Sequence, residues 1–228
     1  MKVLICDKLP EQCSEIIRNA GLEPVVKTDM TPEQLKANIG QYDGVIVRSS
    51  TRITADALSA AGRLRVVCRA GVGVDNVDVV AASKKGVVVM NTPGGNTVST
   101  AEHTVAMLLA LTRSIRQAAN SVKEGKWDRK KFTGTQLAGK TLGVVGLGRV
   151  GFEVARRAAA FEMRVLAYDP YITTEKAAQC QASLVKRLDD LYRQSDYITL
   201  HTPLTDDTRG LVGKRAFGLM KKGVRIIN

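Results

Sequence analysis

The chain has 228 residues, of which 44% are hydrophobic and 25% charged, which is typical of a globular protein and not of a disordered one. Its longest unbroken apolar run, 105–111, is far shorter than the roughly 20 residues of a membrane-spanning helix, so we expect no membrane association. The net charge of +12 raises nucleic-acid binding as a hypothesis. The basic residues are spread along the chain, however, so we favour a solvated surface or an anionic small-molecule partner.

Cysteine and histidine are too few and too scattered for a metal site or a disulfide framework. The four cysteines lie at positions 6, 13, 68 and 180, without a C-x-x-C pair, and the chain has only two histidines. We therefore expect no metal, reduced thiols and a cytoplasmic protein.

Short β-rich runs alternate with helical patterns over the first 97 residues. The predicted strands are Lys2–Asp7, Pro24–Lys27, Gly44–Arg48, Arg65–Arg69 and Val87–Asn91, and the predicted helices are about 10–20, 32–39, 54–61 and 76–84. Such an alternation predicts a doubly wound parallel sheet with helices on both faces. We assign it to a first α/β domain at 1–97.

A second α/β alternation follows a long predicted helix at Val98–Glu124 and a basic loop at 125–140. The later strands are predicted at Thr141–Gly146, Arg164–Asp169, Ser183–Val185, Asp196–Thr202 and Val224–Asn228, with helices at Val150–Phe161, about 173–180, 188–194 and 213–220. This pattern predicts a second domain at 98–228. Because no crossover follows its last strand, we expect this domain to be truncated before a final strand.

A glycine-rich turn joins the first strand of the second domain to its helix. Gly146, Gly148 and Gly151 form a G-x-G-x-x-G, and Asp169 stands at the end of the next strand. In this context the glycines allow a tight turn, a close approach of the pyrophosphate and helix packing, and the acidic residue receives the ribose hydroxyls. Because Pro170–Thr173 contains no cation for a 2′-phosphate, we predict NAD and not NADP.

Two other motifs are typical of functional sites, but their positions in the predicted helices and strands do not favour such sites. Residues 134–141 match the G-x-x-x-x-G-K-[ST] pattern of a phosphate-binding loop, but they run into a strand, whereas such a loop must follow a strand and open a helix. Glu102 and His103 lie in the first turn of a helix, where a glutamate is favoured by the helix dipole. We interpret both residues as structural or interface-forming.

Residues at three strand ends are candidates for ligand contacts. His201, Thr202 and Pro203 end a strand at the predicted ligand edge of the second sheet. The backbone there suits a position beside the nicotinamide, while the His201 side chain fits a half-buried structural role equally well. Arg48 and Arg69 end adjacent strands of the first sheet and favour an anion site.

These segments in this order resemble the D-isomer-specific 2-hydroxyacid dehydrogenases. The resemblance covers the whole chain and rests on Val47–Ser49, Arg69–Asn76, Asn91–Thr97, Gly125–Lys131, Gly139–Gly148, Tyr168–Pro170, His201–Pro203 and Lys222–Asn228. It implies a flavodoxin-like substrate-binding domain and a Rossmann NAD-binding domain, with the active site in the cleft between them. It also implies a homo-oligomer formed through the NAD domain.

The resemblance also assigns binding residues. Substrate contacts are expected from Arg48, Arg69 and Asn96, and cofactor contacts from Val72, Gly146, Gly148, Arg149, Val150, Gly151, Asp169, Pro170, His201, Thr202 and Pro203. The catalytic arginine, glutamate and histidine of the family match positions beyond Asn228, so no catalytic residue is assigned here. We expect these 228 residues alone to bind NAD weakly or not at all and to show no turnover.

The reaction that the resemblance implies is the NAD-dependent oxidation of 3-phospho-D-glycerate to 3-phosphohydroxypyruvate, the first step of serine biosynthesis. Two alternatives stay open. One is a glyoxylate or hydroxypyruvate reductase, which would differ in its preference for an unphosphorylated acid. The other is a non-catalytic protein that senses NAD(H), like the corepressors that share this fold.

Overall fold

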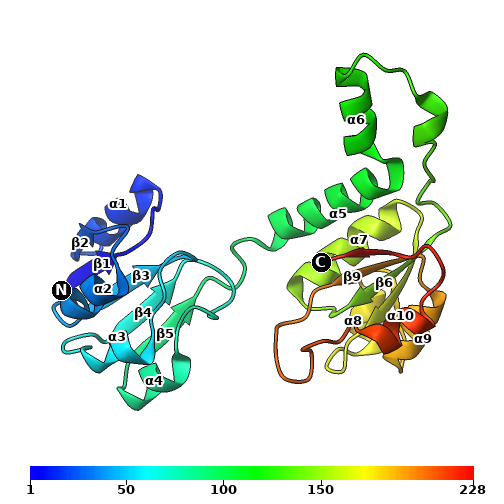
Figure 1. The fold of residues 1–228 in the computed structure, drawn as a ribbon. Coiled ribbons are helices and arrows are strands. Elements are labelled where there is room, and N and C mark those ends of the chain that lie inside the picture. Colours follow the sequence, from blue (N-terminus) through cyan, green and yellow to red (C-terminus); the bar gives the residue numbers. More distant parts are fainter. The chain divides into compact units, whose positions relative to one another are not determined.

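The computed structural model describes residues 1–228 and divides them into two compact units, Met1–Asn96 (unit 1) and Thr97–Asn228 (unit 2) (Figure 1). Each unit contains one five-stranded sheet in which all strand pairs are parallel. The predicted α/β class with two doubly wound sheets is therefore confirmed. No helix in either unit has the length and apolar character needed to cross a membrane.

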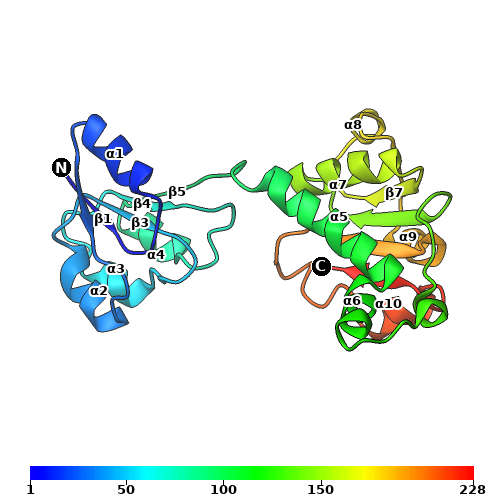
Figure 2. The same cartoon turned by 90° about the horizontal axis from the view of Figure 1, so that it is seen from above.

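The sheet of unit 1 has the strand order β2-β1-β3-β4-β5, which is the flavodoxin-like order. Its strands are β1 (Lys2–Ile5), β2 (Glu23–Val26), β3 (Gly44–Val47), β4 (Val66–Arg69) and β5 (Val88–Asn91), and its helices are α1 (Glu11–Asn19), α2 (Pro32–Ile39), α3 (Ala55–Ser59) and α4 (Val79–Lys84). Helix α1 lies on one face of the sheet, and α2, α3 and α4 lie on the other (Figure 2). The order reverses between β1 and β3, which places a ligand crevice at the carboxyl ends of these two strands.

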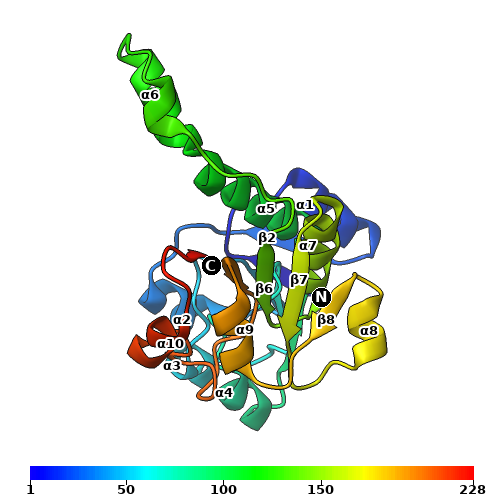
Figure 3. The ribbon, with the colours of Figure 1, turned by 90° about the vertical axis from the view of Figure 1, so that its right-hand side faces the viewer.

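The sheet of unit 2 has the order β10-β9-β6-β7-β8, the arrangement of a dinucleotide-binding fold. Its strands are β6 (Thr141–Val145), β7 (Arg164–Tyr168), β8 (Ala182–Leu184), β9 (Tyr197–Leu200) and β10 (Arg225–Ile227). Its later helices are α7 (Arg149–Ala160), α8 (Thr174–Ala178), α9 (Leu188–Gln194) and α10 (Lys214–Leu219). Helices α7 and α8 lie on one face of the sheet, and α9 and α10 lie on the other (Figure 3). Apolar side chains of each pair of helices pack against the face that they cover.

The prediction of a single long helix at 98–124 is wrong, because this segment forms two helices, α5 (Thr97–Arg113) and α6 (Ile115–Lys123). Ser114 between them adopts φ 50° and ψ 39°, a left-handed conformation. The Thr112 carbonyl accepts a hydrogen bond from the Thr135 amide (3.3 Å) in place of a continuing helical one. The break therefore coincides with a contact between residues that are well separated in the sequence. Helix α6 projects from the body of unit 2 (Figure 1) and leads to a short 3-10 helix, η1 (Arg129–Phe132), in the segment expected to be a loop.

All four cysteines are free thiols. Cys6 and Cys180 are buried, and Cys13 and Cys68 are partly buried. Burial raises the pKa of the Cys6 thiol to about 12, so this side chain stays protonated and acts as a small apolar core residue.

Candidate functional site

The turn after β6 brings the ends of two strands together. Gly146 follows β6 with φ 89°, a conformation that L side chains rarely adopt. A Cβ atom built on Gly146 would lie 2.8 Å from the His201 carbonyl oxygen and 3.0 Å from the Thr202 Cγ2 atom. Only glycine therefore allows the turn to close against the segment that follows β9.

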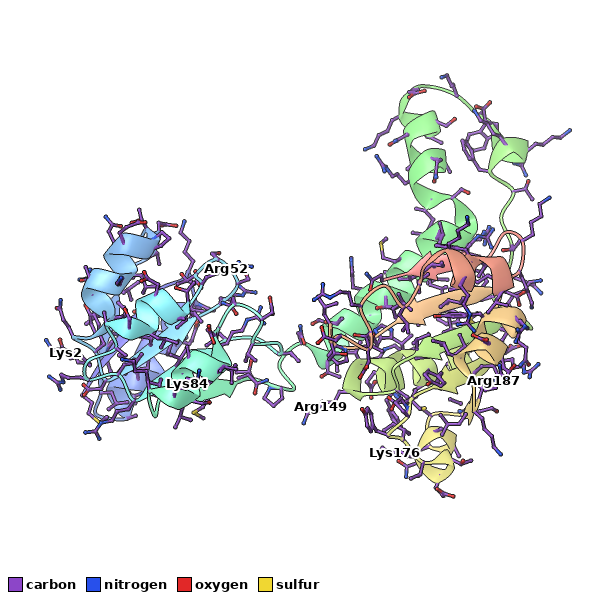
Figure 4. All side chains as sticks on the ribbon, turned by 60° about the horizontal axis from the view of Figure 1, so that its bottom comes forward. Lys2, Arg52, Lys84, Arg149, Lys176 and Arg187 are labelled. Carbon is purple, nitrogen blue, oxygen red and sulfur yellow. The ribbon has the colours of Figure 1, made fainter.

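The other two glycines of the motif have different surroundings. A Cβ on Gly151 would overlap the Gly146 carbonyl oxygen, so its absence lets α7 start directly against the turn. A Cβ on Gly148 would meet no atom within 4 Å, and Gly148 begins α7 without a side-chain cap. The backbone at the start of α7 is thus open toward solvent where a diphosphate would approach the helix amino terminus. Arg149, exposed in the first turn, extends outward (Figure 4), and Val150 beside it is half-buried.

Asp169 is fixed at the end of β7 by two backbone hydrogen bonds. Its Oδ2 atom accepts from the Leu147 amide at 2.8 Å, and its Oδ1 atom accepts from the Tyr171 amide at 2.9 Å. A carboxylate oxygen has more than one acceptor position, so both atoms retain capacity for ribose hydroxyls. The glycine-rich turn therefore orients the carboxylate, with the exposed Pro170 next to it.

The segment His201–Pro203 lines the same edge mainly with its backbone. The His201 amide donates to the Val145 carbonyl at 2.8 Å, which extends the pairing of β9 with β6. Its Nε2 atom lies 2.9 Å from the Thr199 hydroxyl, and burial lowers the pKa of the ring to about 4. His201 is thus neutral at neutral pH and bonds within its own strand edge. Thr202 is half-buried and Pro203 exposed.

In unit 1, the exposed Arg48 follows β3 at the point where the strand order reverses. A cavity of about 280 Å³ opens there, at the carboxyl ends of β1, β2 and β3. It is lined by Asp7, Lys8, Asp29, Arg48, Ser49 and Ser50. Two cations, two carboxylates and two hydroxyls line this crevice at a topological switch point, so its formal charges balance, and Arg48, Lys8 and the serine hydroxyls are the groups able to contact an anionic ligand.

Arg69, predicted as the partner of Arg48, is enclosed by its own loop. Its NH1 atom lies 2.9 Å from Asp75 Oδ1, its Nε donates to the Arg48 carbonyl at 3.3 Å, and only 14% of its side chain is exposed. A Cβ on Gly73 would lie 2.9 Å from the same NH1 atom, so a larger residue there would force the guanidinium group to shift. The two arginines are thus in contact through the Arg48 carbonyl. The Arg48 side chain is exposed to solvent, whereas the Arg69 side chain is largely buried.

Sequence reasoning missed two buried residues that hold the Arg48 loop. The Asp7 carboxylate accepts from the Arg48 amide and from the Thr51 hydroxyl, the latter at 2.9 Å. The Asn76 side-chain amide donates to the carbonyls of Arg48 (2.7 Å) and Thr51 (2.6 Å), while its Oδ1 atom is buried without a partner. The position of Asp7 after the first strand was the available signal, since polar residues at carboxyl ends of parallel strands face the ligand edge.

The remaining predicted residues are placed as follows. The Val72 carbonyl accepts from the Asn91 side chain at 2.6 Å, which joins the β4 loop to the end of β5, and Asn96 is the exposed last residue of unit 1. Glu102 on α5 lies 3.7 Å from Arg157 on α7, an ion pair that suits the structural role expected for it. Residues 134–141 run into β6 and open no helix, so they form no nucleotide-triphosphate loop.

Comparison with known proteins assigns the two halves of the chain. Residues 3–154 match the catalytic domain and residues 105–228 match the NAD binding domain of the D-isomer specific 2-hydroxyacid dehydrogenases. The chain belongs to this family. The NAD cofactor predicted from the glycine-rich turn is thereby confirmed, and the open backbone at Gly148 fits such a cofactor.

The similar proteins are named as dehydrogenases. D-3-phosphoglycerate dehydrogenases from Archaeoglobus fulgidus and Rattus norvegicus are 52% and 51% identical across the whole chain. The chain spans 43% and 42% of the length of these two relatives. A solved 3-phosphoglycerate dehydrogenase from Entamoeba histolytica with bound NAD⁺ is 33% identical with a TM-score of 0.82, over 99% of this chain and 70% of that one.

Proposed function

We propose that the protein oxidises 3-phospho-D-glycerate to 3-phosphohydroxypyruvate with NAD as the hydride acceptor. The observation that carries the proposal is the turn Gly146–Gly151, whose open helix terminus and fixed Asp169 carboxylate form a dinucleotide cradle. The names of the relatives support the phosphorylated substrate. The product is a 2-oxo acid, which an amination would convert to an amino acid, and on this basis we place the reaction at the start of serine biosynthesis. Four free thiols support a cytoplasmic location.

The residues of unit 2 would hold the cofactor in a defined orientation. The amides at the start of α7 would receive the diphosphate, and Asp169 would accept the ribose hydroxyls and repel a 2′-phosphate. The backbone of His201–Pro203 would lie beside the nicotinamide. NAD, when bound, supplies the electrophilic carbon that takes the hydride from the substrate.

The residues of unit 1 would bind the acid. Arg48 presents a planar fork for a carboxylate or phosphate, and Lys8 adds a second positive charge to the same cavity. Ser49 and Ser50 supply hydroxyl donors. Arg69, which is ion-paired with Asp75, would support the Arg48 loop through its hydrogen bond to the Arg48 carbonyl.

The test is NADH formation by the full-length protein with 3-phosphoglycerate, glycerate and glyoxylate as alternative substrates. Arg48→Gln is expected to raise KM for 3-phosphoglycerate by about tenfold or more, because a charge-assisted hydrogen bond is lost. Arg52→Gln is the matched control, since Arg52 (labelled in Figure 4) is exposed on the same loop and is not one of the residues that line the cavity.

Three outcomes would contradict the proposal. Preference for the unphosphorylated acids would favour the glyoxylate or hydroxypyruvate reductase. Binding of NADH without turnover of any acid would favour a sensor protein. An equal effect of the two arginine substitutions would show that the cavity does not bind the substrate.

We further propose a homo-oligomer formed through unit 2. Leu111, Ile115, Val122 and Trp127 expose between 44% and 76% of their surface on α5, α6 and the following loop. Exposed apolar residues that cluster on one projecting element are typical of protein interfaces. Sedimentation equilibrium of the full-length protein is expected to give a dimer or a multiple of it, and a monomer at micromolar concentration would contradict this.

A further inference from the structure

A second cavity of the protein lies in unit 2, at the edge of the sheet opposite the cofactor turn. It has a volume of about 160 Å³ and is lined by Thr135, Lys140, Asp196, Tyr197, Lys221, Lys222, Gly223, Val224 and Arg225. Thr141, Tyr197 and Arg225 are the first residues of β6, β9 and β10. From Tyr197 to His201 the chain rises about 13 Å, at about 3.3 Å per residue, so the cavity is separate from the dinucleotide cradle.

The cavity carries an excess of positive charge. Four cationic side chains and one carboxylate line it. The carboxylate, Asp196, is already occupied: its Oδ1 atom accepts from Lys221 Nζ at 2.8 Å and its Oδ2 atom accepts from the Thr141 amide at 2.8 Å. Lys140, Lys222 and Arg225 form no ion pair, although the charge of Lys140 helps to lower the pKa of Asp196, so the cavity keeps a positive excess.

Arg225 is fixed in place by neutral groups. Its NH1 atom donates to the Tyr197 hydroxyl at 2.7 Å and lies 3.4 Å from the Thr135 hydroxyl, and its guanidinium lies 5.3 Å from the centre of the Tyr197 ring. Tyr197 is only 1% exposed, and its hydroxyl also contacts the Thr112 hydroxyl at 3.2 Å. A rigid, half-buried arginine without a carboxylate partner is preorganised for an oxyanion, because little side-chain entropy is lost on binding.

We propose that this cavity binds a small phosphate-type oxyanion, either free inorganic phosphate or the phosphate group of an organic ester. Arg225 is the main contact, and Lys140 and Lys222 add charge. A volume below the roughly 300 Å³ of ordinary small-molecule pockets excludes a nucleotide and suits an ion or a single phosphate group. The phosphate-loop-like sequence at 134–141 contributes Thr135 and Lys140 to this site, although it has no phosphate-loop geometry.

The site is connected to the break between α5 and α6. Tyr197 joins Arg225 to Thr112, and the Thr112 carbonyl in turn receives the Thr135 amide next to the left-handed Ser114. An oxyanion on Arg225 would therefore rigidify the base of the projecting α6. This effect is measurable as slower hydrogen exchange at the amides of α6.

The experiment is calorimetric titration of the full-length protein with inorganic phosphate, against chloride at matched ionic strength and with NAD saturating so that the dinucleotide site is filled. Arg225→Gln is expected to weaken phosphate binding by about tenfold or more, and Lys222→Gln by a smaller factor. Lys214→Gln is the control: it removes one exposed charge from the nearby α10 and is expected to change the affinity less than twofold.

A second titration, with glycerol 3-phosphate, separates the two sources of the phosphate group. Binding of both ligands with the same dependence on Arg225 assigns the site to phosphate esters as well as the ion, and binding of phosphate alone assigns it to the free ion. If Arg225→Gln unfolds the chain, Lys222→Gln still tests the site, because Lys222 is exposed. The proposal is overturned by the absence of phosphate binding at millimolar concentration, or by equal binding in the Arg225, Lys222 and Lys214 variants.

Discussion

In both units the candidate site lies at the carboxyl-terminal edge of a parallel sheet. The two sites differ in the groups that form them. In unit 2 the site is made of backbone: three glycines shape the turn, and the carboxylate of Asp169 is held by amides. In unit 1 the site is made of side chains, and the Arg48 loop is held by the buried Asp7 and Asn76. A backbone site tolerates no added atom at its closest contacts, whereas a side-chain site tolerates shape changes but not the loss of a buried partner.

The glycines of unit 2 give the largest expected effect. Gly151→Val would place side-chain atoms on the Gly146 carbonyl and is expected to destabilise unit 2 by more than about 3 kcal/mol and to abolish NAD binding. Gly148→Ala meets no atom and is expected to change stability by less than about 0.5 kcal/mol while weakening NAD binding, because the methyl group occupies the cradle. Denaturant titration and NAD calorimetry on both variants measure this. Unchanged NAD affinity in Gly148→Ala would contradict the position of the cradle.

His201 predicts a pH dependence that belongs to unit 2 alone. Its folded pKa of about 4 lies below the ordinary value of 6.5, so between these pH values the unfolded chain binds more protons. This residue therefore contributes stability that is present above pH 6.5 and is lost as the pH falls to 4, by up to about 3 kcal/mol. Hydrogen exchange at the amides of β6 and β9 as a function of pH measures it. An identical pH slope in His201→Gln would contradict the assignment.

Asp7 tests the side-chain site of unit 1 with a smaller effect. Asp7→Asn keeps the shape but replaces an acceptor oxygen with a donor that faces the Arg48 and Thr51 amides. We expect a loss of about 1–3 kcal/mol of stability in unit 1 and a higher KM for the acid, with NAD affinity unchanged. Asp29→Asn is the control, since Asp29 lines the same cavity and forms no hydrogen bond to that loop. Equal KM values in the two variants would show that Asp7 does not position the loop.

Local patterns in the sequence were sufficient to predict the strands and the glycine-rich turn of unit 2. The strands lie within two residues of their predicted ends, because short β-branched runs between glycine and proline signals depend mainly on neighbouring residues. The glycine-rich turn could be predicted from the sequence for the same reason. Its spacing and its position between a strand and a helix are local properties of Gly146–Gly151.

Features that depend on contacts between residues distant in the sequence could not be predicted from the sequence. The break at Ser114 lies beside the hydrogen bond between Thr135 and Thr112, and Arg69 is enclosed by the loop that carries Gly73 and Asp75. The basic cavity gathers residues from four separate segments of the chain, between Thr135 and Arg225. In each case the deciding contact joins residues whose proximity only the folded chain creates.

The most direct test of the account is the choice between NAD and NADP, because it depends on one carboxylate oriented by the glycine-rich turn. Titration of the full-length protein with both dinucleotides is expected to show at least about tenfold tighter binding of NAD, since a 2′-phosphate would face the Asp169 charge. Asp169→Asn is expected to reduce this preference without unfolding unit 2. Equal affinity for NAD and NADP in the unsubstituted protein would contradict the site described for unit 2.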